Sequence, residues 1–285
     1  MRTAATANPQ HPLVAAPLTA QADPLGVAAT RAVLNETYKS LLLLWGRRSV
    51  VLIELIGIAA TYPFIQFVIG NGTIDRTLVR PTLLAFLTFP LLFVTTYKVV
   101  GDLLEEINSG TFEQLHLSPV SPTWLLVGRL VASVIEGVLI AAIIAVGMAW
   151  ALGVSLPLRV AAVLPATLTI IDIVGVALVI GGLSLWLPQI GALVHLINSL
   201  IFALNGTLIP VEMYPGWVQT LARVLPTTLG IEATRKVVLD GQSLGAIWAD
   251  GTLPWLVVHA VGLAALGWLV FLVNDRRLKQ RGISR

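Results

Sequence analysis

The sequence predicts an all-α membrane protein with six transmembrane helices, an N-terminal amphipathic interface helix and two short outer re-entrant helices. Charged residues make up 12% of the chain, about half of the roughly 25% found in a soluble domain. Hydrophobic residues make up 56% and gather in long runs that suit the hydrocarbon core of a bilayer. A chain of this composition has too few polar side chains to cover a water-soluble globule.

Six stretches are apolar enough to cross the hydrocarbon core, which needs about 20 residues as a helix. The spans are predicted at residues 49–70, 81–100, 124–152, 158–186, 190–211 and 253–273. The third and fourth exceed the required length, so we expect these two helices to tilt or to extend beyond the lipid. Together they define a transmembrane domain over residues 47–275.

The segment before the first span has two parts. Residues 1–26 are rich in Ala, Pro, Gln and Thr and lack the continuous apolar core of a signal peptide, which predicts a disordered cytosolic tail. Residues 27–46 place Leu34, Leu41 and Trp45 at helical spacing, with polar residues largely on the other side. This pattern predicts an amphipathic helix in the inner interface. A water-exposed extension of the first span is the alternative.

Lys and Arg residues gather on one side of the predicted spans. Arg47 and Arg48 precede the first span, and Arg276 and Arg277 follow the sixth. Charges this close to a span set its orientation, with the positive side facing the cytosol. We therefore expect a multi-pass protein of the cell (plasma or inner) membrane with both termini cytosolic, and residues 276–285 as a basic cytosolic tail.

The outer segment at residues 211–252 contains two helical patterns, 213–225 and 227–239, separated by Pro226. Asp240-Gly241 is a stop signal for the second pattern. Each helix is too short to span, and irregular backbone at membrane depth must be shielded by protein. The pattern predicts re-entrant or interfacial helices. The residues singled out here are Pro215, Pro226, Glu232 and Arg235.

Several kinds of chemistry are absent from the sequence. There is no cysteine, which excludes disulfides, thiolate metal ligands and a cysteine nucleophile. No lysine follows a glycine, so the chain lacks the Gly-x-x-x-x-Gly-Lys-Ser/Thr loop that cradles phosphates. No two histidines stand at i, i+4, and no metal site is expected. The chain is not predicted to be an enzyme or to hold a cofactor.

The predicted inner loop at residues 101–123 carries the densest group of acids in the chain. Its pattern is a short polar helix between turns at Gly110-Thr111 and Ser118-Pro119. A helix held crosswise beneath the membrane is well placed to be gripped by a soluble partner. A solvated connecting loop is the alternative interpretation.

This loop resembles the ABC-2 family of transporter permeases, of the drug-resistance and polysaccharide-export types. Members carry a glutamate-rich run before Gly-Thr, a short helix, a Ser/Thr-Pro turn, and Gly-Lys/Arg entering the third span. The matching positions are Glu106, Gly110, Thr111, Glu113, Leu115, Ser118, Pro119, Gly128 and Arg129. Ile107-Asn108-Ser109 stands where many members have Arg-Glu-Arg/Lys. The order of interface helix, spans, inner loop and outer helices extends the resemblance over nearly the whole chain.

The resemblance implies the permease subunit of an ATP-binding-cassette exporter. It would assemble with a second permease copy or homologue and with two copies of a separate ATPase, which would hold ATP and Mg. The expected partners include membrane lipid and exclude nucleic acid, and the expected substrate is an amphipathic drug or lipid moved outward. Glu106 is expected to pair with a basic residue of the ATPase. The expected coupling residues are Glu105, Glu106, Gly110, Thr111, Glu113, Leu115, Ser118 and Pro119.

Glu136, Asp172 and Asn198 lie inside predicted spans, where a charge costs roughly 3 kcal/mol. Two interpretations are open. In the first, these residues line the substrate route or bind a cationic group. In the second, the acids are protonated and hydrogen-bonded to a neighbouring helix. A secondary transporter or channel without an ATPase is the alternative function, and it would favour internal repeats and midplane ion sites. A membrane enzyme would need a clustered nucleophile and base, which the sequence does not present.

Overall fold

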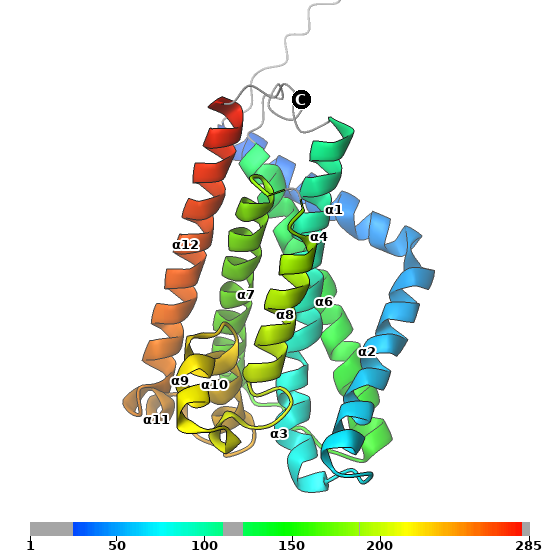
Figure 1. Cartoon of the computed structure of the whole chain (residues 1–285), viewed down its shortest axis with the longest axis vertical. Coiled ribbons are helices and arrows are strands. Elements are labelled where there is room, and N and C mark those ends of the chain that lie inside the picture. Colours follow the sequence, from blue (N-terminus) through cyan, green and yellow to red (C-terminus); the bar gives the residue numbers. More distant parts are fainter. Residues whose placement is uncertain (1–24, 111–121, 188, 281–285) are drawn as a thin grey trace, which may run out of the picture.

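The computed structural model describes residues 25–110, 122–187 and 189–280 of the 285-residue chain. These residues form helices joined by turns, and no strand occurs among them. The long helices run side by side as a bundle (Figure 1). The predicted all-α fold class is therefore confirmed.

The elements along the chain are, in order, α1 Leu25–Gly46, α2 Arg48–Ile69, α3 Arg76–Phe86, α4 Thr88–Ser109, α6 Pro122–Leu152, η1 Val160–Ala162, α7 Val163–Ser184, α8 Gly191–Leu204, η2 Val211–Met213, α9 Gly216–Val224, α10 Thr228–Val238, α11 Leu244–Ala249 and α12 Thr252–Gln280. Here η denotes a 3-10 helix. The long helices alternate in direction along the chain, except that α3 continues into α4 and α1 lies across the bundle (Figure 1).

Five helical stretches in the described part of the chain are long and apolar enough to cross a membrane. They are Arg48–Ile69, Thr77–Ser109, Thr123–Leu152, Val160–Ser184 and Thr252–Leu278. The fifth predicted span, 190–211, is shorter than expected, because α8 has 14 residues and rises about 21 Å. After it the Asn205 side chain accepts a hydrogen bond from the Thr207 amide at 3.0 Å, and Gly206 has a φ of +90°. This turn ends the helix before Pro210.

The second predicted span, 81–100, is longer than expected. α3 and α4 are joined through Leu87 in helical conformation, and α4 continues through Ser109 into the predicted inner loop. It ends at Gly110, whose φ of +70° is a conformation that glycine adopts without steric cost. Of the expected coupling residues, those that lie outside the described residues are Thr111, Glu113, Leu115, Ser118 and Pro119.

α7 lies in the centre of the bundle and packs closely against α12. A Cβ built on Gly267 of α12 would lie 2.4 Å from the carbonyl oxygen of Gly175 on α7. A Cβ on Gly182 of α7 would lie 2.8 Å from the backbone of Phe271. Small residues let helix backbones approach in this way, which is a common means of packing helices inside lipid.

The two ends of the bundle differ (Figure 1). α1 lies across the end at which α4 and α12 finish, here called the α1 end, whereas α9, α10 and α11 lie toward the opposite end, the α9–α11 end. Exposed tryptophans occur toward both ends, as expected for side chains at headgroup depth. Those of the α1 end are Trp45, Trp124 and Trp186, and those of the α9–α11 end are Trp150, Trp217, Trp248 and Trp255.

Candidate functional site

Arg129, near the start of α6, joins three helices at the α1 end. Its Nε lies 2.9 Å from Oε1 of Glu36 on α1, and its Nη2 donates to Oε1 of Glu106 on α4. These three side chains are at most 15% exposed. Charge-assisted hydrogen bonds from a planar guanidinium fix both the distance and the direction between the groups they join. They are stronger in a buried site than at the surface, where water competes for the same donors and acceptors. We call Glu36, Glu106 and Arg129 the Arg129 cluster.

Gly128 explains why α1 reaches this position. A Cβ at Gly128 would lie 2.8 Å from the Cβ of Glu36 and 2.9 Å from the carbonyl oxygen of Val33, so only glycine allows α1 and α6 to cross so closely. The Thr37 hydroxyl donates to the Gly128 carbonyl at 3.0 Å. The Gly128-Arg129 pair therefore serves two purposes: close packing of α1 and connection of α1 to α4.

The expected coupling residues of the inner loop are partly described. Glu105 is exposed on the last turns of α4, and Gly110 forms the turn that ends this helix. The Glu106 carboxylate, expected to face a partner protein, is bonded to Arg129 of the same chain. The reason is that α4 continues as a helix beyond residue 100 and carries Glu106 onto the face next to α6.

Glu136 of α6 forms an ion pair with Lys98 of α4, and the two side chains are 6% and 12% exposed. Its partner is thus a cation of the same chain. Asn198 of α8 donates from Nδ2 to the Thr96 hydroxyl at 2.8 Å. Its Oδ1 is buried and has no hydrogen-bond partner in the described part of the chain.

Asp172 of α7 is 1% exposed and connects α7 to α12 and to the α9–α11 end. Its Oδ1 lies 2.8 Å from Nδ1 of His259, and its Oδ2 accepts from the Thr227 amide at 2.7 Å. Nε2 of His259 lies 3.0 Å from the Val224 carbonyl oxygen, which accepts only, so Nε2 carries a proton. Asp172 and His259 share a second proton between Oδ1 and Nδ1.

Thr227 is held in an uncommon backbone conformation by this arrangement. Its φ is +72°, which few non-glycine residues adopt. Besides the bond to Asp172, its hydroxyl accepts from Nδ2 of Asn205 at 2.8 Å. Sequence analysis singled out Asp172 but did not predict its contacts with His259 and Thr227. A lone histidine in the apolar stretch 253–273 was the available signal.

The outer segment contains the two predicted helices, as α9 and α10, and a third, α11, that sequence analysis did not predict. Pro215 directly precedes α9, and Pro226 lies between α9 and α10. Arg235 of α10 donates from Nε to the Pro81 carbonyl at 2.9 Å and from Nη2 to the Gly206 carbonyl at 2.6 Å. Burial lowers the pKa of Arg235, and Glu212 and Glu232 oppose this shift.

Aromatic rings form a continuous series along α3 and α4 that faces α8. Adjacent ring centroids are 5.7 Å apart from Phe86 to Phe89, 5.6 Å from Phe89 to Phe93 and 4.2 Å from Phe93 to Tyr97. α8 contributes Phe202, 4.5 Å from Phe89. The rings follow one another at spacings of 3, 4 and 4 residues, which places them on one face of the continuous helical stretch that α3 and α4 form.

These features define a polytopic α-helical membrane protein whose buried polar groups connect helices. Residues 25–110, 122–187 and 189–280 contain no group of three or more His, Asp or Glu suited to a metal ion. The sequence model of the ABC-2 type transporter family matches residues 32–239. The chain belongs to this family, and the resemblance found in the sequence is confirmed.

Two curated relatives agree with this assignment. The probable multidrug ABC transporter permease YbhR of Escherichia coli (strain K12) is 29% identical over 197 residues, covering 67% of this chain and 51% of the relative. The inner membrane transport permease YhhJ of Escherichia coli (strain K12) is 24% identical over 165 residues, covering 56% of this chain and 42% of the relative. The chain thus aligns with about half the length of these relatives.

Proposed function

We propose that this chain is the permease subunit of an ATP-binding-cassette exporter of the cell membrane, with both termini cytosolic. It pairs with a second permease copy and with two copies of an ATPase that binds ATP and Mg. It moves an amphipathic drug-like or lipid-like substrate outward as the ATPases hydrolyse ATP. Membership in the ABC-2 family supports a transport role, as do relatives named a multidrug ABC transporter permease and a transport permease.

The Arg129 cluster is the observation that carries the proposal. The end of α4 and the start of α6 flank the segment 111–121, where the resemblance expects the ATPase to dock. Arg129 connects both helices to α1 through charge-assisted bonds. A push on this segment would therefore move α1, α4 and α6 together, because a rigid joint transmits a displacement that a flexible connection would absorb.

The aromatic series along α4 and α8 supports the substrate class. Phe89, Phe93 and Phe202 are partly exposed and present ring faces and edges, which bind apolar and aromatic groups well. Near them the buried Oδ1 of Asn198 offers an acceptor without a partner in the described residues. An apolar surface with a few polar groups suits an amphipathic molecule.

The test is to remove the central guanidinium. Arg129→Gln removes the guanidinium that joins Glu36 of α1 to Glu106 of α4, and the exposed Lys39, 3.3 Å from Glu36, belongs to α1 itself. We therefore expect substrate-stimulated ATP hydrolysis and export by the purified complex to fall about tenfold or more. Glu106→Lys and Gly110→Val should have the same effect. Membrane insertion should persist. The matched control is Arg47→Gln, an exposed arginine at the same end.

Two results would contradict the proposal. If Arg129→Gln keeps full ATPase association and full export, the cluster is only a packing contact. If the purified chain alone transports substrate in liposomes without an ATPase, the protein is a secondary transporter or channel.

A further inference from the structure

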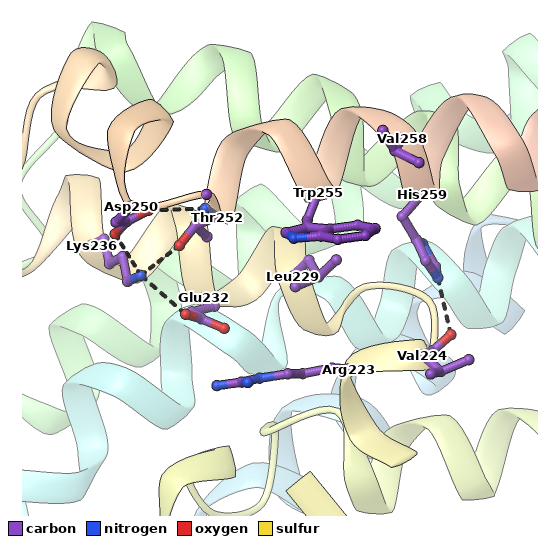
Figure 2. A pocket seen from close by; sticks show the side chains of 11 residues that line it. Arg223, Val224, Leu229, Glu232, Lys236, Asp250, Thr252, Trp255, Val258 and His259 are labelled. Atoms are coloured by element: carbon purple, nitrogen blue, oxygen red, sulfur yellow. Dashed lines mark hydrogen bonds and ion pairs between the residues drawn. The ribbon is translucent and has the colours of Figure 1, made fainter. Parts of the chain in front are cut away.

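A cavity of about 620 Å³ opens between α9, α10 and the first turns of α12 (Figure 2). Small-molecule sites in proteins occupy roughly 300–1,000 Å³, so the cavity has the size of a ligand site. Figure 2 shows that its lining has two parts: Glu232, Lys236 and Asp250 lie on one side, and Trp255 and Val258 lie on the other.

The charged side contains one cation between two carboxylates. Nζ of Lys236 lies 3.1 Å from Oε1 of Glu232 and 2.9 Å from Oδ2 of Asp250. Hydrogen bonds from Lys236 and from the Thr252 amide lower the pKa of Asp250 to about 2, so this carboxylate is ionised at neutral pH. These three side chains together carry one negative charge.

Arg223 of α9 balances this excess. It lines the cavity, is exposed, and has no hydrogen bond or ion pair with another residue of the described ranges. The Asp172–His259 pair is neutral as a whole, whichever atom holds the shared proton. The lining therefore has a net charge of zero while presenting separate positive and negative groups.

The apolar side of the cavity is exposed where the candidate span of α12 begins. Trp255 and Val258 are 66% and 61% exposed at the start of a candidate span. Trp217 and Trp248 are exposed at the same end of the bundle, where tryptophans mark a membrane interface. The charged side therefore lies with the headgroups, and the apolar side with the acyl chains.

We propose that this cavity binds a zwitterionic phospholipid with a primary-amine headgroup. Arg223 binds the phosphate, Glu232 and Asp250 accept from the ammonium group, and the first part of an acyl chain lies along Trp255 and Val258. A neutral headgroup with separated charges matches a neutral lining, whereas an anionic headgroup would leave an uncompensated charge in a partly desolvated site. This lipid site goes beyond the proposed transport function, since it requires neither an ATPase nor ATP.

Native mass spectrometry of the detergent-purified chain tests the site. Phosphatidylethanolamine, phosphatidylcholine and phosphatidylglycerol are added separately at equal concentration, with free phosphoethanolamine as a fourth ligand. We expect the wild-type chain to retain phosphatidylethanolamine about tenfold more than either other lipid or the free headgroup. Arg223→Gln should retain about tenfold less phosphatidylethanolamine than the wild-type chain. Glu232→Gln should reduce the preference for phosphatidylethanolamine over phosphatidylglycerol. Arg80→Gln, an exposed arginine outside the cavity lining, should change nothing.

Other outcomes would overturn the assignment. Equal retention of the three lipids, preference for phosphatidylglycerol, or undiminished retention by Arg223→Gln would each exclude it. Equal binding of free phosphoethanolamine would show that the apolar side takes no part. Because Arg223 is exposed, Arg223→Gln should fold normally, and its thermal unfolding temperature checks this.

Discussion

Asp172 satisfies groups from two other segments with one carboxyl group. The Thr227 amide belongs to the α9–α11 end, whereas His259 belongs to α12. The Thr227 amide needs a hydrogen-bond acceptor, and Nδ1 of a neutral His259 needs a donor. A side-chain amide in place of the carboxyl group could supply both. This arrangement separates two roles that a buried acid can have: a fixed hydrogen-bonding group, or a charge that acts on the substrate.

Asp172→Asn should leave stability and export close to wild type. The new Oδ1 accepts from Thr227, and Nδ2 donates to Nδ1 of a neutral His259 that still donates from Nε2 to Val224. Asp172→Leu should instead leave the Thr227 amide and Nδ1 of His259 without partners, at about 1–3 kcal/mol for each buried group. Thermal unfolding in detergent and export assays measure the difference. Lost export by a stable Asp172→Asn protein would show that the charge itself is required.

Glu136 behaves differently, because its partner is a cation. Glu136→Gln removes the carboxylate that pairs with the buried Lys98 ammonium and leaves it only the Coulombic attraction of Asp102, so we expect the free energy of unfolding to fall by about 3–5 kcal/mol. The double variant Lys98→Met, Glu136→Leu should recover most of this loss, since a buried pair replaced by apolar groups is often neutral. Unfolding curves of the single and double variants provide the measurement. A single variant as stable as wild type would show that Lys98 has another partner or reaches water.

At the scale of helices, α7 and α12 depend on backbone contact. Gly267→Leu places a side chain 2.4 Å from the Gly175 carbonyl oxygen, and backbone atoms cannot rotate away as a side chain would. We expect the two helices to be forced apart at a cost of about 1–3 kcal/mol or more. Gly262→Leu on the same helix is the matched control, because nothing lies within 4 Å of its Cβ position. Equal unfolding temperatures for the two variants would contradict the close contact.

For the whole molecule, the orientation in the membrane is the open prediction. The chain has no cysteine, so single cysteines report without background. With cytosolic termini, Gly245→Cys at the α9–α11 end should react with an impermeant thiol reagent in intact cells, because the positive charges beside the spans favour the cytosol. Ser109→Cys at the α1 end should react only after the membrane is opened. Labelling of Ser109→Cys from outside would show that the orientation is the opposite one. It would also exclude docking of the ATPase at residues 111–121.

Sequence analysis located most helices well because the signal is local. Apolar run length predicted α2, α6, α7 and α12, and Pro226 separated α9 from α10 where the structure separates them. It was wrong on the end of α8, where an Asn205 side chain starts a turn inside an apolar stretch. It also missed α11, which has only six residues and no extended periodic pattern.

Composition and the order of apolar and charged segments by themselves determined the membrane class, the positions of most helices and the family resemblance. Only the tertiary structure decided the partners of the polar residues. Arg129 and Glu36 are 93 residues apart in sequence, and Asp172 and His259 are 87 apart. The physical reason is that the length of an apolar run is a local property of the sequence. An ion pair between distant residues depends instead on which helix faces pack against each other.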